Sequence, residues 1–341
     1  MCAVASFFCG QVSRSKTIRP YVHVVISFSL CVCIFSDGCA ASALEGYSQT
    51  CKPFPRILHR TNCFNDTWVD GMLQVDPQGA GKVFVEIGCN TGVDAVHWLE
   101  RWGVRPGRAL AWMRYMRRPG ACKQNLPAKA KVRTVAGSAG ADPYVMCVEP
   151  LRSNIGMLRS TSHLLAIPQT SFEVVHAAVS DRAGFAAFPE GPPGFERCSL
   201  AGCGDGSSGT TAVNLTTVDA LLAERGLESI DVLSVDAEGY DPLVLAGAKR
   251  ALRSVRYLAF EVHQRRVGPW AFTTVVDVAR DLDEVGLDCF WAGNNGNLQR
   301  ITRCWSEADE ARQYPIPWSN IVCARRLDIW HSALRDFEGT V

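Results

Sequence analysis

The sequence has almost no net charge. Its 35 Lys and Arg residues nearly balance its 34 Asp and Glu residues, and the formal net charge is +1. A chain with so weak an overall field is not drawn as a whole to nucleic acid or to an anionic membrane. Long low-complexity blocks are also missing, and 47% of the 341 residues are hydrophobic. A chain of this length and composition buries a core, so we expect one main globular domain.

The N-terminal region lacks a hydrophobic run of ordinary transmembrane length. Basic residues that include Arg14 and Arg19 precede an apolar run from Tyr21 to Phe35, which is shorter than the roughly 20 residues that span a bilayer. Small residues at 41–43 offer a cleavage site. Residues 1–45 therefore predict either a cleaved signal peptide or a short signal anchor. Both place the protein in the secretory pathway, in the Golgi lumen or outside the cell.

None of the 15 cysteines pairs with another at the CxxC spacing of zinc sites, so a cysteine-bound metal is disfavoured. We expect Cys89 and Cys147 to be free thiols buried in the sheet and its first turn. Eight others suffice for four disulfides of open pairing: Cys51, Cys63, Cys122, Cys198, Cys203, Cys289, Cys304 and Cys323. This usage agrees with secretion, and sequons at Asn65 and Asn214 are compatible with a lumenal glycoprotein.

From about residue 80, short apolar runs alternate with helical patterns, which predicts an α/β fold with a mostly parallel sheet. The expected strands are 83–87, 144–148, 172–177, 230–235, 257–262, 287–292 and 320–324. The expected helices are 92–102, 152–159, 242–252 and 273–285, with Asp241 as the N-cap of the third. We therefore divide the chain into a targeting segment (1–45), an N-terminal extension (46–79) and a main domain (80–341).

Two stretches interrupt this alternation. Residues 101–141 contain ten Lys or Arg and no Asp or Glu, so we interpret them as an insertion. The insertion is either an amphipathic element for an anionic lipid surface or acidic glycan, or a solvated mobile loop, which we favour. Residues 189–209 are rich in Gly, Pro and Ser and contain Cys198 and Cys203, which predicts a loop held by a short disulfide.

The first expected strand ends in a turn that lacks the GxGxxG of dinucleotide sites. The turn from Glu86 to Gly92 reads GxNxG, and Glu86 would repel a phosphate. This disfavours a nucleotide-dependent oxidoreductase and suits a cofactor that carries an amino group and no phosphate. Glu149 ends the second strand, where a carboxylate accepts hydrogen bonds from both hydroxyls of a ribose.

The most informative stretch runs from Ile230 to Tyr240 and contains Asp-Ala-Glu-Gly at 236–239. It precedes a helix with a Gly-Ala step and a strand that ends in Glu261-Val262-His263. Together with the Glu86–Gly92 turn, Glu149-Pro150, 177–181 and 217–219, these blocks resemble the FkbM-type methyltransferases in content and order. The resemblance covers about residues 80–265, without the insertion.

This resemblance implies a Rossmann-like class I methyltransferase that uses S-adenosylmethionine, usually on a hydroxyl of a sugar or small metabolite. It implies that the methionine end of the cofactor contacts Glu86, Gly88, Asn90 and Gly92. It implies that the ribose contacts Glu149 and that the adenine edge contacts Ser180 and Asp181. It also implies that Asp236, Glu238 and His263 face the transferred methyl group. The family often has a lysine two residues before Asp236, and this chain has Ser234, so a charged role at that position is lost.

Methyl transfer from a sulfonium is an in-line displacement that depends mainly on alignment. His263 is the candidate base for the hydroxyl proton, and a histidine that only caps a strand end is the alternative. Asp236 is the rival base, or joins Glu238 on a divalent cation, for which no further ligands are assigned. Glu261 is a candidate to orient a backbone amide or a substrate hydroxyl.

Aromatic and amide residues follow at 291–297, 304–305 and 318–320. They predict contacts to a sugar or, alternatively, a disulfide-braced cap on the sheet, and we favour the sugar contacts. The leading hypothesis is an O-methyltransferase of the secretory pathway that acts on a glycan or small-molecule hydroxyl. Its rival is a catalytically silent glycan-binding or scaffolding protein with the same fold. We expect no nucleic-acid partner, and a membrane partner only through an N-terminal anchor.

Overall fold

The computed structural model describes residues 51–52, 66–103, 107–116, 142–195, 198–200, 202–203, 209–263, 267–313 and 318–339. They all belong to one compact unit, Cys51–Val341. The expected targeting segment, residues 1–45, lies outside the described residues. Within the described part, no helix has the length and hydropathy needed to cross a bilayer.

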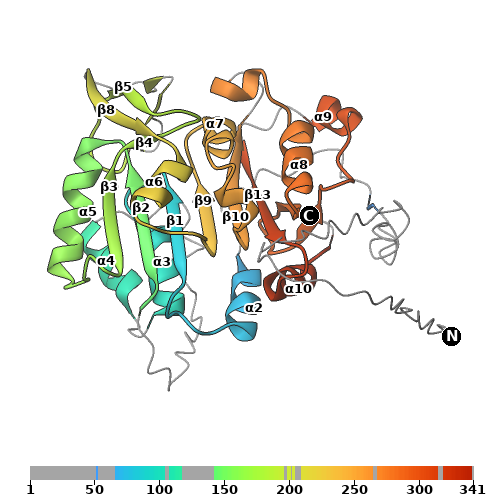
Figure 1. Ribbon diagram of the computed structural model, residues 1–341, viewed down its shortest axis with the longest axis horizontal. Helices are drawn as coiled ribbons and strands as arrows, with labels where there is room; N and C mark the ends of the chain where they lie inside the picture. The colour runs from blue at the N-terminus through green and yellow to red at the C-terminus, as the bar shows by residue number, and fades with distance from the viewer. Residues whose placement is uncertain are drawn as a thin grey trace, which may run out of the picture. The chain divides into compact units, whose positions relative to one another are not determined.

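An eight-stranded sheet forms the centre of this unit (Figure 1). Five strands are parallel: β1 (Val83–Ile87), β2 (Tyr144–Glu149), β3 (Phe172–His176), β9 (Val232–Val235) and β10 (Tyr257–His263). Three more add antiparallel: β11 (Leu287–Ala292), β12 (Leu298–Arg300) and β13 (Trp318–Arg325). The strand order is β12-β11-β13-β10-β9-β1-β2-β3. The predicted fold class, an α/β fold with a mostly parallel sheet, is confirmed.

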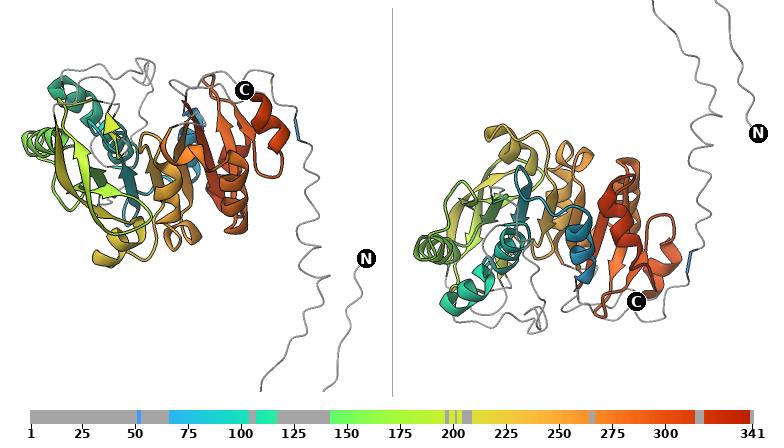
Figure 2. Two further views of the ribbon diagram at one scale, coloured as in Figure 1. Left: turned by 90° about the horizontal axis from the view of Figure 1, so that it is seen from above. Right: turned by 90° about the horizontal axis from the view of Figure 1, so that it is seen from below.

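Side chains of the central strands alternate between two buried cores. In β1, Val85 and Ile87 join one core, and Phe84 joins the other. The first core includes α6 (Val218–Glu224), α7 (Asp241–Ala246) and α8 (Val275–Glu284). The second includes α2 (Thr67–Val75), α3 (Val93–Trp102), α5 (Arg152–Leu164) and α10 (Ile329–Arg335). Helices thus cover both faces of the sheet, as Figure 2 shows.

Part of the basic insertion is helical, which corrects our interpretation of it as a mobile loop. Helix α4 (Arg108–Met116) buries Trp112, whose ring lies 5.3 Å from that of Phe172 and whose Nε1 donates to the Thr91 carbonyl at 2.8 Å. Arg108 forms a buried ion pair with Asp142 at 2.9 Å. The basic composition of the segment favours solvent, but burial of the large Trp112 indole stabilises the packed helix more than the solvated charges oppose it. The rest of the insertion, 117–141, lies outside the described residues.

A second sheet packs beside the ends of β2 and β3. It has the order β4-β8-β5, with β4 at Ala178–Val179, β8 at Thr210–Thr216 and β5 at Gly184–Pro189. The expected loop at 189–209 contains a short ladder of β6 (Cys198–Ser199) and β7 (Gly202–Cys203). Cys198 is disulfide-bonded and lies opposite Cys203 in this ladder, in agreement with the predicted short disulfide.

Besides the bond of Cys198, the described part of the chain contains the disulfides Cys51–Cys304, Cys89–Cys147 and Cys289–Cys323. The second of these corrects the prediction that Cys89 and Cys147 are free thiols. Cys89 lies two residues after the end of β1, and Cys147 lies in the neighbouring strand β2. Their Cα atoms are 5.6 Å apart, within bonding range. Both cysteines are buried, as expected, but the pairing depends on which strands are neighbours.

Candidate functional site

The predicted site residues gather at the carboxyl edge of the parallel strands. The glycine turn follows β1, Glu149 ends β2, the Asp236–Gly239 turn follows β9, and His263 ends β10. Because β2, β1, β9 and β10 are consecutive neighbours in the sheet, their carboxyl ends lie side by side. This edge is where open parallel sheets bind ligands.

The glycine turn packs directly against the turn after β9. Gly88 has a φ of +78°, and a Cβ on it would lie 1.8 Å from the carbonyl oxygen of Asp236. Gly92 has a φ of +73°, and a Cβ on it would lie 2.6 Å from the Leu158 side chain. Both positions therefore require glycine, for conformation and for space. The expected cofactor turn and the expected catalytic turn are in contact through backbone atoms.

Glu86 lies on β1 beside Ser234 of β9. The Ser234 hydroxyl donates to one carboxylate oxygen of Glu86 at 3.0 Å, and the other oxygen is buried without a hydrogen-bond partner among the described residues. Burial, with the added negative charges of Asp94 and Asp236, raises the pKa of Glu86 well above its usual value. Where the resembling family often has a lysine, this chain thus places a hydroxyl that hydrogen-bonds Glu86.

Glu149 organises the turn from the neighbouring strand. Its two carboxylate oxygens accept backbone N–H groups of Asn90 at 2.8 Å and Leu151 at 2.7 Å. Asn154 donates to the Asn90 side chain at 3.2 Å. Burial raises the pKa of Glu149 to about 7, although these N–H donors oppose the shift. Carboxylate oxygens keep further lone pairs, so the ribose role predicted for Glu149 is compatible with these contacts.

Ser180 and Asp181 follow β4. The Ser180 N–H donates to the Thr216 carbonyl at 2.9 Å, and its hydroxyl donates to the Asp181 carboxylate at 3.1 Å. A Cβ on Gly247 would lie 2.1 Å from the Ser180 carbonyl oxygen, so the segment packs tightly on the end of α7. These contacts fix the segment in place, and its predicted role at the adenine edge stays a prediction.

Asp241 has a different role from the predicted N-cap. Helix α7 begins at Asp241 and its N-cap is Tyr240, which makes no side-chain cap bond. The fully buried Asp241 carboxylate instead accepts backbone N–H groups of Ala237 at 3.4 Å, Gly239 at 3.2 Å and Glu261 at 3.3 Å. Burial, and then the charge of Asp236, raises the pKa of Asp241 to about 8. Asp241 therefore ties the turn after β9 to β10.

Glu261 and His263 lie two residues apart on one face of β10, with His263 Nε2 at 2.6 Å from the Glu261 carboxylate. Burial lowers the pKa of His263 to about 4. Burial, and then the charges of Asp236, Asp241 and Glu238, raises the pKa of Glu261 well above its usual value. Both shifts favour the neutral form of the group concerned. One ligand atom each from Glu238, Glu261 and His263 lie within 4.8 Å of one another.

The aromatic residues divide into two groups. Trp291 and Trp305 are buried and stacked at 5.3 Å, and Trp305 Nε1 donates to Glu310, so their predicted sugar contact is wrong. They form part of a cap that the Cys51–Cys304 disulfide braces, which is the alternative we considered. Trp318 is half-buried and lies opposite His263 in the β10–β13 ladder.

The sequence reasoning missed the position of Asp241, and it left Glu261 without a defined partner. Residues two apart in a strand share a face, so the spacing of Glu261 and His263 was the available indication that the two side chains are partners. No local signal places Trp318 opposite His263, because that pairing depends on an antiparallel strand more than 50 residues later.

A mostly parallel α/β sheet, with a glycine turn and acidic side chains at its carboxyl edge, defines a ligand-binding domain of the Rossmann-like class. Residues 126–285 match the family model of the FkbM methyltransferase domain. This part of the chain is therefore similar to an FkbM methyltransferase domain. The match includes the positions from Glu149 to His263, whereas the glycine turn at 86–92 precedes it.

A crystal structure of an FkbM methyltransferase from Methylobacillus flagellatus KT is similar to this chain, with 12% sequence identity and a TM-score of 0.37. The similarity covers 72% of this chain and 44% of that one. This chain therefore spans less than half the length of that protein. No curated protein matches the chain.

Proposed function

We propose that the protein is an S-adenosylmethionine-dependent O-methyltransferase that acts on a hydroxyl of a glycan, glycoconjugate or small metabolite. The observation that carries this proposal is the contact between the two turns, in which a Cβ on Gly88 would lie 1.8 Å from the Asp236 carbonyl oxygen. A ligand held by the turn after β1 therefore lies next to the acidic turn that follows β9. Methyl transfer requires this proximity, because its rate depends on alignment of donor and acceptor.

The residues present fit S-adenosylmethionine. The turn has no feature that selects a pyrophosphate, and the buried Glu86 oxygen without a described partner suits an ammonium group. Glu86, Gly88, Asn90 and Gly92 would hold the methionine end and Glu149 the ribose. Ser180 and Asp181 would lie at the adenine. When bound, this cofactor supplies a methyl group on a positively charged sulfur.

The acceptor hydroxyl loses its proton as its oxygen becomes an ether, and the acidic edge provides the acceptor for that proton. His263 and Asp236 were the two candidates. Because burial lowers the pKa of His263 to about 4, His263 is a weak base at neutral pH. An ordinary Asp carboxylate is no stronger as a base, so basicity alone does not select between the two. We favour Asp236 as proton acceptor on position, because its turn contacts the glycine turn, with the Glu261–His263 pair and Glu238 orienting the acceptor oxygen.

A sugar acceptor in the secretory pathway is supported by two features. Trp318 lies opposite His263 at the start of β13, where an indole face suits stacking on a sugar ring. The disulfides among the described residues suit an oxidising compartment. With the basic and apolar character of residues 1–45, they favour the Golgi lumen or secretion.

Calorimetric titration with S-adenosylmethionine tests the proposal against its rival, a catalytically silent glycan-binding protein. We expect one site in the wild-type chain, and loss of binding in Glu86→Ala and Glu149→Ala. Glu224→Gln, an exposed carboxylate on α6, is the matched control and should bind as the wild type does. Absence of binding at millimolar cofactor would overturn the enzyme proposal.

A further inference from the structure

The acidic edge brings together three side chains that can also bind a metal ion. Glu238, Glu261 and His263 each offer one ligand atom, and the three lie within 4.8 Å of one another. Ligands bound to one cation at about 2.0–2.2 Å lie at most about 4.4 Å apart. A shift of a few tenths of an ångström brings all three atoms into the coordination distance of a single ion.

The fold holds these groups in place from two directions. Glu238 and Gly239 both have positive φ, 50° and 93°, which reverses the chain directly after β9. A Cβ on Gly239 would lie 2.7 Å from a Val267 methyl group, so the turn is also confined by the segment after β10. Asp241 bonds the backbone of this turn and that of Glu261. The buried Asp241 carboxylate therefore holds the turn that carries Glu238 against the strand that carries Glu261 and His263.

The donor set is selective for certain cations. Two carboxylate oxygens and one imidazole nitrogen suit Mn²⁺, Fe²⁺, Co²⁺ or Zn²⁺, whereas Ca²⁺ and Mg²⁺ prefer oxygen ligands. Three protein ligands also leave open positions for water or substrate, as in catalytic metal sites.

The electrostatics of the edge favour a cation. Asp236, Glu238, Asp241 and Glu261 converge on this edge, and their negative charges repel one another. A divalent cation offsets that repulsion.

We propose that Glu238, Glu261 and His263 bind one divalent transition-metal cation at the carboxyl ends of β9 and β10. Its open position binds the acceptor hydroxyl, lowers the pKa of that hydroxyl and places its oxygen for methylation, while the released proton goes to the Asp236 carboxylate. The metal site stands on its own geometry. Its role toward the acceptor rests on the proposed methyltransferase function.

The test measures metal binding directly, without turnover. The full-length protein is stripped with chelator and titrated with Mn²⁺, and the electron paramagnetic resonance signal of free Mn²⁺ gives the bound fraction. We expect one site per chain in the wild type, and affinity weakened at least about tenfold in Glu261→Gln and His263→Gln, because each loses a ligand or its charge. Glu224→Gln should bind as the wild type does.

Two further measurements keep the metal site separate from the methyltransferase proposal. Glu149→Ala should lose S-adenosylmethionine binding and keep Mn²⁺ binding. Glu238→Gln lies on a turn, so it tests the metal site even if the substitutions within β10 impair folding. It should weaken Mn²⁺ binding, and circular dichroism checks the folding of each variant. No stoichiometric Mn²⁺ or Zn²⁺ binding by folded wild type, or equal affinity in all variants, would overturn the metal site. Metal binding without cofactor binding would keep the metal site and overturn the methyltransferase proposal.

Discussion

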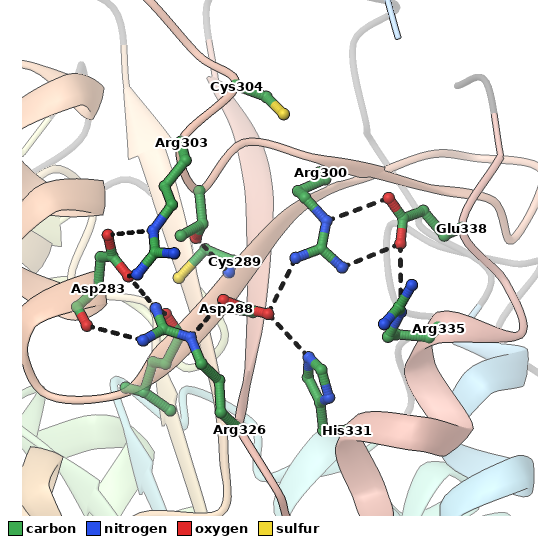
Figure 3. A network of polar contacts seen from close by, with 12 residues as sticks. Asp283, Asp288, Cys289, Arg300, Arg303, Cys304, Arg326, His331, Arg335 and Glu338 are labelled. Carbon is green, nitrogen blue, oxygen red and sulfur yellow. Dashed lines mark hydrogen bonds and ion pairs between the residues drawn. The ribbon is translucent and has the colours of Figure 1, made fainter. Parts of the chain in front are cut away.

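Two regions of this molecule gather buried carboxylates in opposite ways. At the carboxyl edge of the parallel strands, Asp241 and Glu261 lie near other carboxylates, and their pKa values are raised. At the antiparallel end of the sheet, Asp288 lies among Arg300, Arg326 and His331 (Figure 3). Burial raises the pKa of Asp288, but hydrogen bonds from His331 and Arg326 and the charge of Arg300 lower it well below its usual value.

The antiparallel region is a paired network. Arg300 contacts both Asp288 at 2.9 Å and Glu338 at 3.0 Å, and Arg326 contacts Asp283 and Asp288 (Figure 3). Such a network holds β11, β12, β13 and α10 together. In a structural region, buried charges are paired with opposite charges. In a catalytic region, charges of one sign lie close together and their pKa values are shifted. The contrast supports the carboxyl edge as the functional site.

The largest effect should come from breaking the paired network. Asp288→Asn removes the negative charge between Arg300, Arg326 and His331, so that Glu338 and Asp283 are the carboxylates that still pair with the two guanidinium groups. We expect the free energy of unfolding to fall by about 3 to 5 kcal/mol. Urea unfolding followed by circular dichroism measures it. A loss below about 1 kcal/mol would contradict the distinction between the two regions.

The same kind of change at the carboxyl edge should spare stability and remove activity. Glu261→Gln replaces a carboxyl group whose pKa is raised with an amide of the same shape. We expect the free energy of unfolding to change by less than about 0.5 kcal/mol. Methyl transfer should fall by about 100-fold or more, because the group orients the reacting site. Paired unfolding and rate measurements check both values, and a large loss of stability with retained activity would reverse the assignment.

The two regions should also respond to pH in opposite directions. Folded Asp241 keeps its proton up to about pH 8, whereas unfolded Asp loses it near about pH 4. Its contribution to stability is complete below the unfolded pKa and is lost as pH rises toward 8. Asp288 has a lowered folded pKa, so its contribution is present above about pH 4 and is lost on acidification.

Unfolding temperatures of the chelator-treated protein between about pH 5 and pH 8 measure the Asp241 contribution. The decline toward pH 8 should be shallower in Asp241→Asn than in the wild type. An unchanged decline in that variant would show that Asp241 does not keep its proton in the folded protein.

The smallest effect should come from an exposed ion pair. Arg280 and Asp277 lie 3.5 Å apart on α8, and more than half of each side chain is exposed. Arg280→Ala should change the free energy of unfolding by less than about 1 kcal/mol, because solvent screens such pairs. The same urea experiment provides the comparison for Asp288→Asn. Equal losses in the two variants would mean that burial does not set the strength of the network.

Local patterns predicted much of the fold. The strands expected at 83–87 and 287–292 have those bounds in the structure, and the expected helix at 273–285 is observed at Val275–Glu284. Apolar periodicity carries this information within a few residues. Helix α4 was missed because its basic residues obscured the one side chain, Trp112, that fixes it in the core.

The site was predicted where residues near in sequence meet, and missed where the sheet brings distant ones together. The Asp236–Gly239 turn was identified from its local sequence alone. The Cys89–Cys147 bond depends on the pairing of β1 with β2, and the position of Trp318 depends on that of β10 with β13. Asp241 was assigned to a cap because Asp before Pro favours one, but its buried carboxylate bonds the preceding turn and Glu261 instead.

The central claim is methyl transfer at the carboxyl edge, and transfer of isotope-labelled methyl tests it most directly. The wild-type protein is incubated with methyl-labelled S-adenosylmethionine and a pool of released glycans, and mass spectrometry then detects labelled methyl ethers. The account predicts labelled glycans with the wild type and none with Glu149→Ala. Cofactor binding without labelled product in glycans, glycolipids or small hydroxylated metabolites would contradict it and favour a catalytically silent protein.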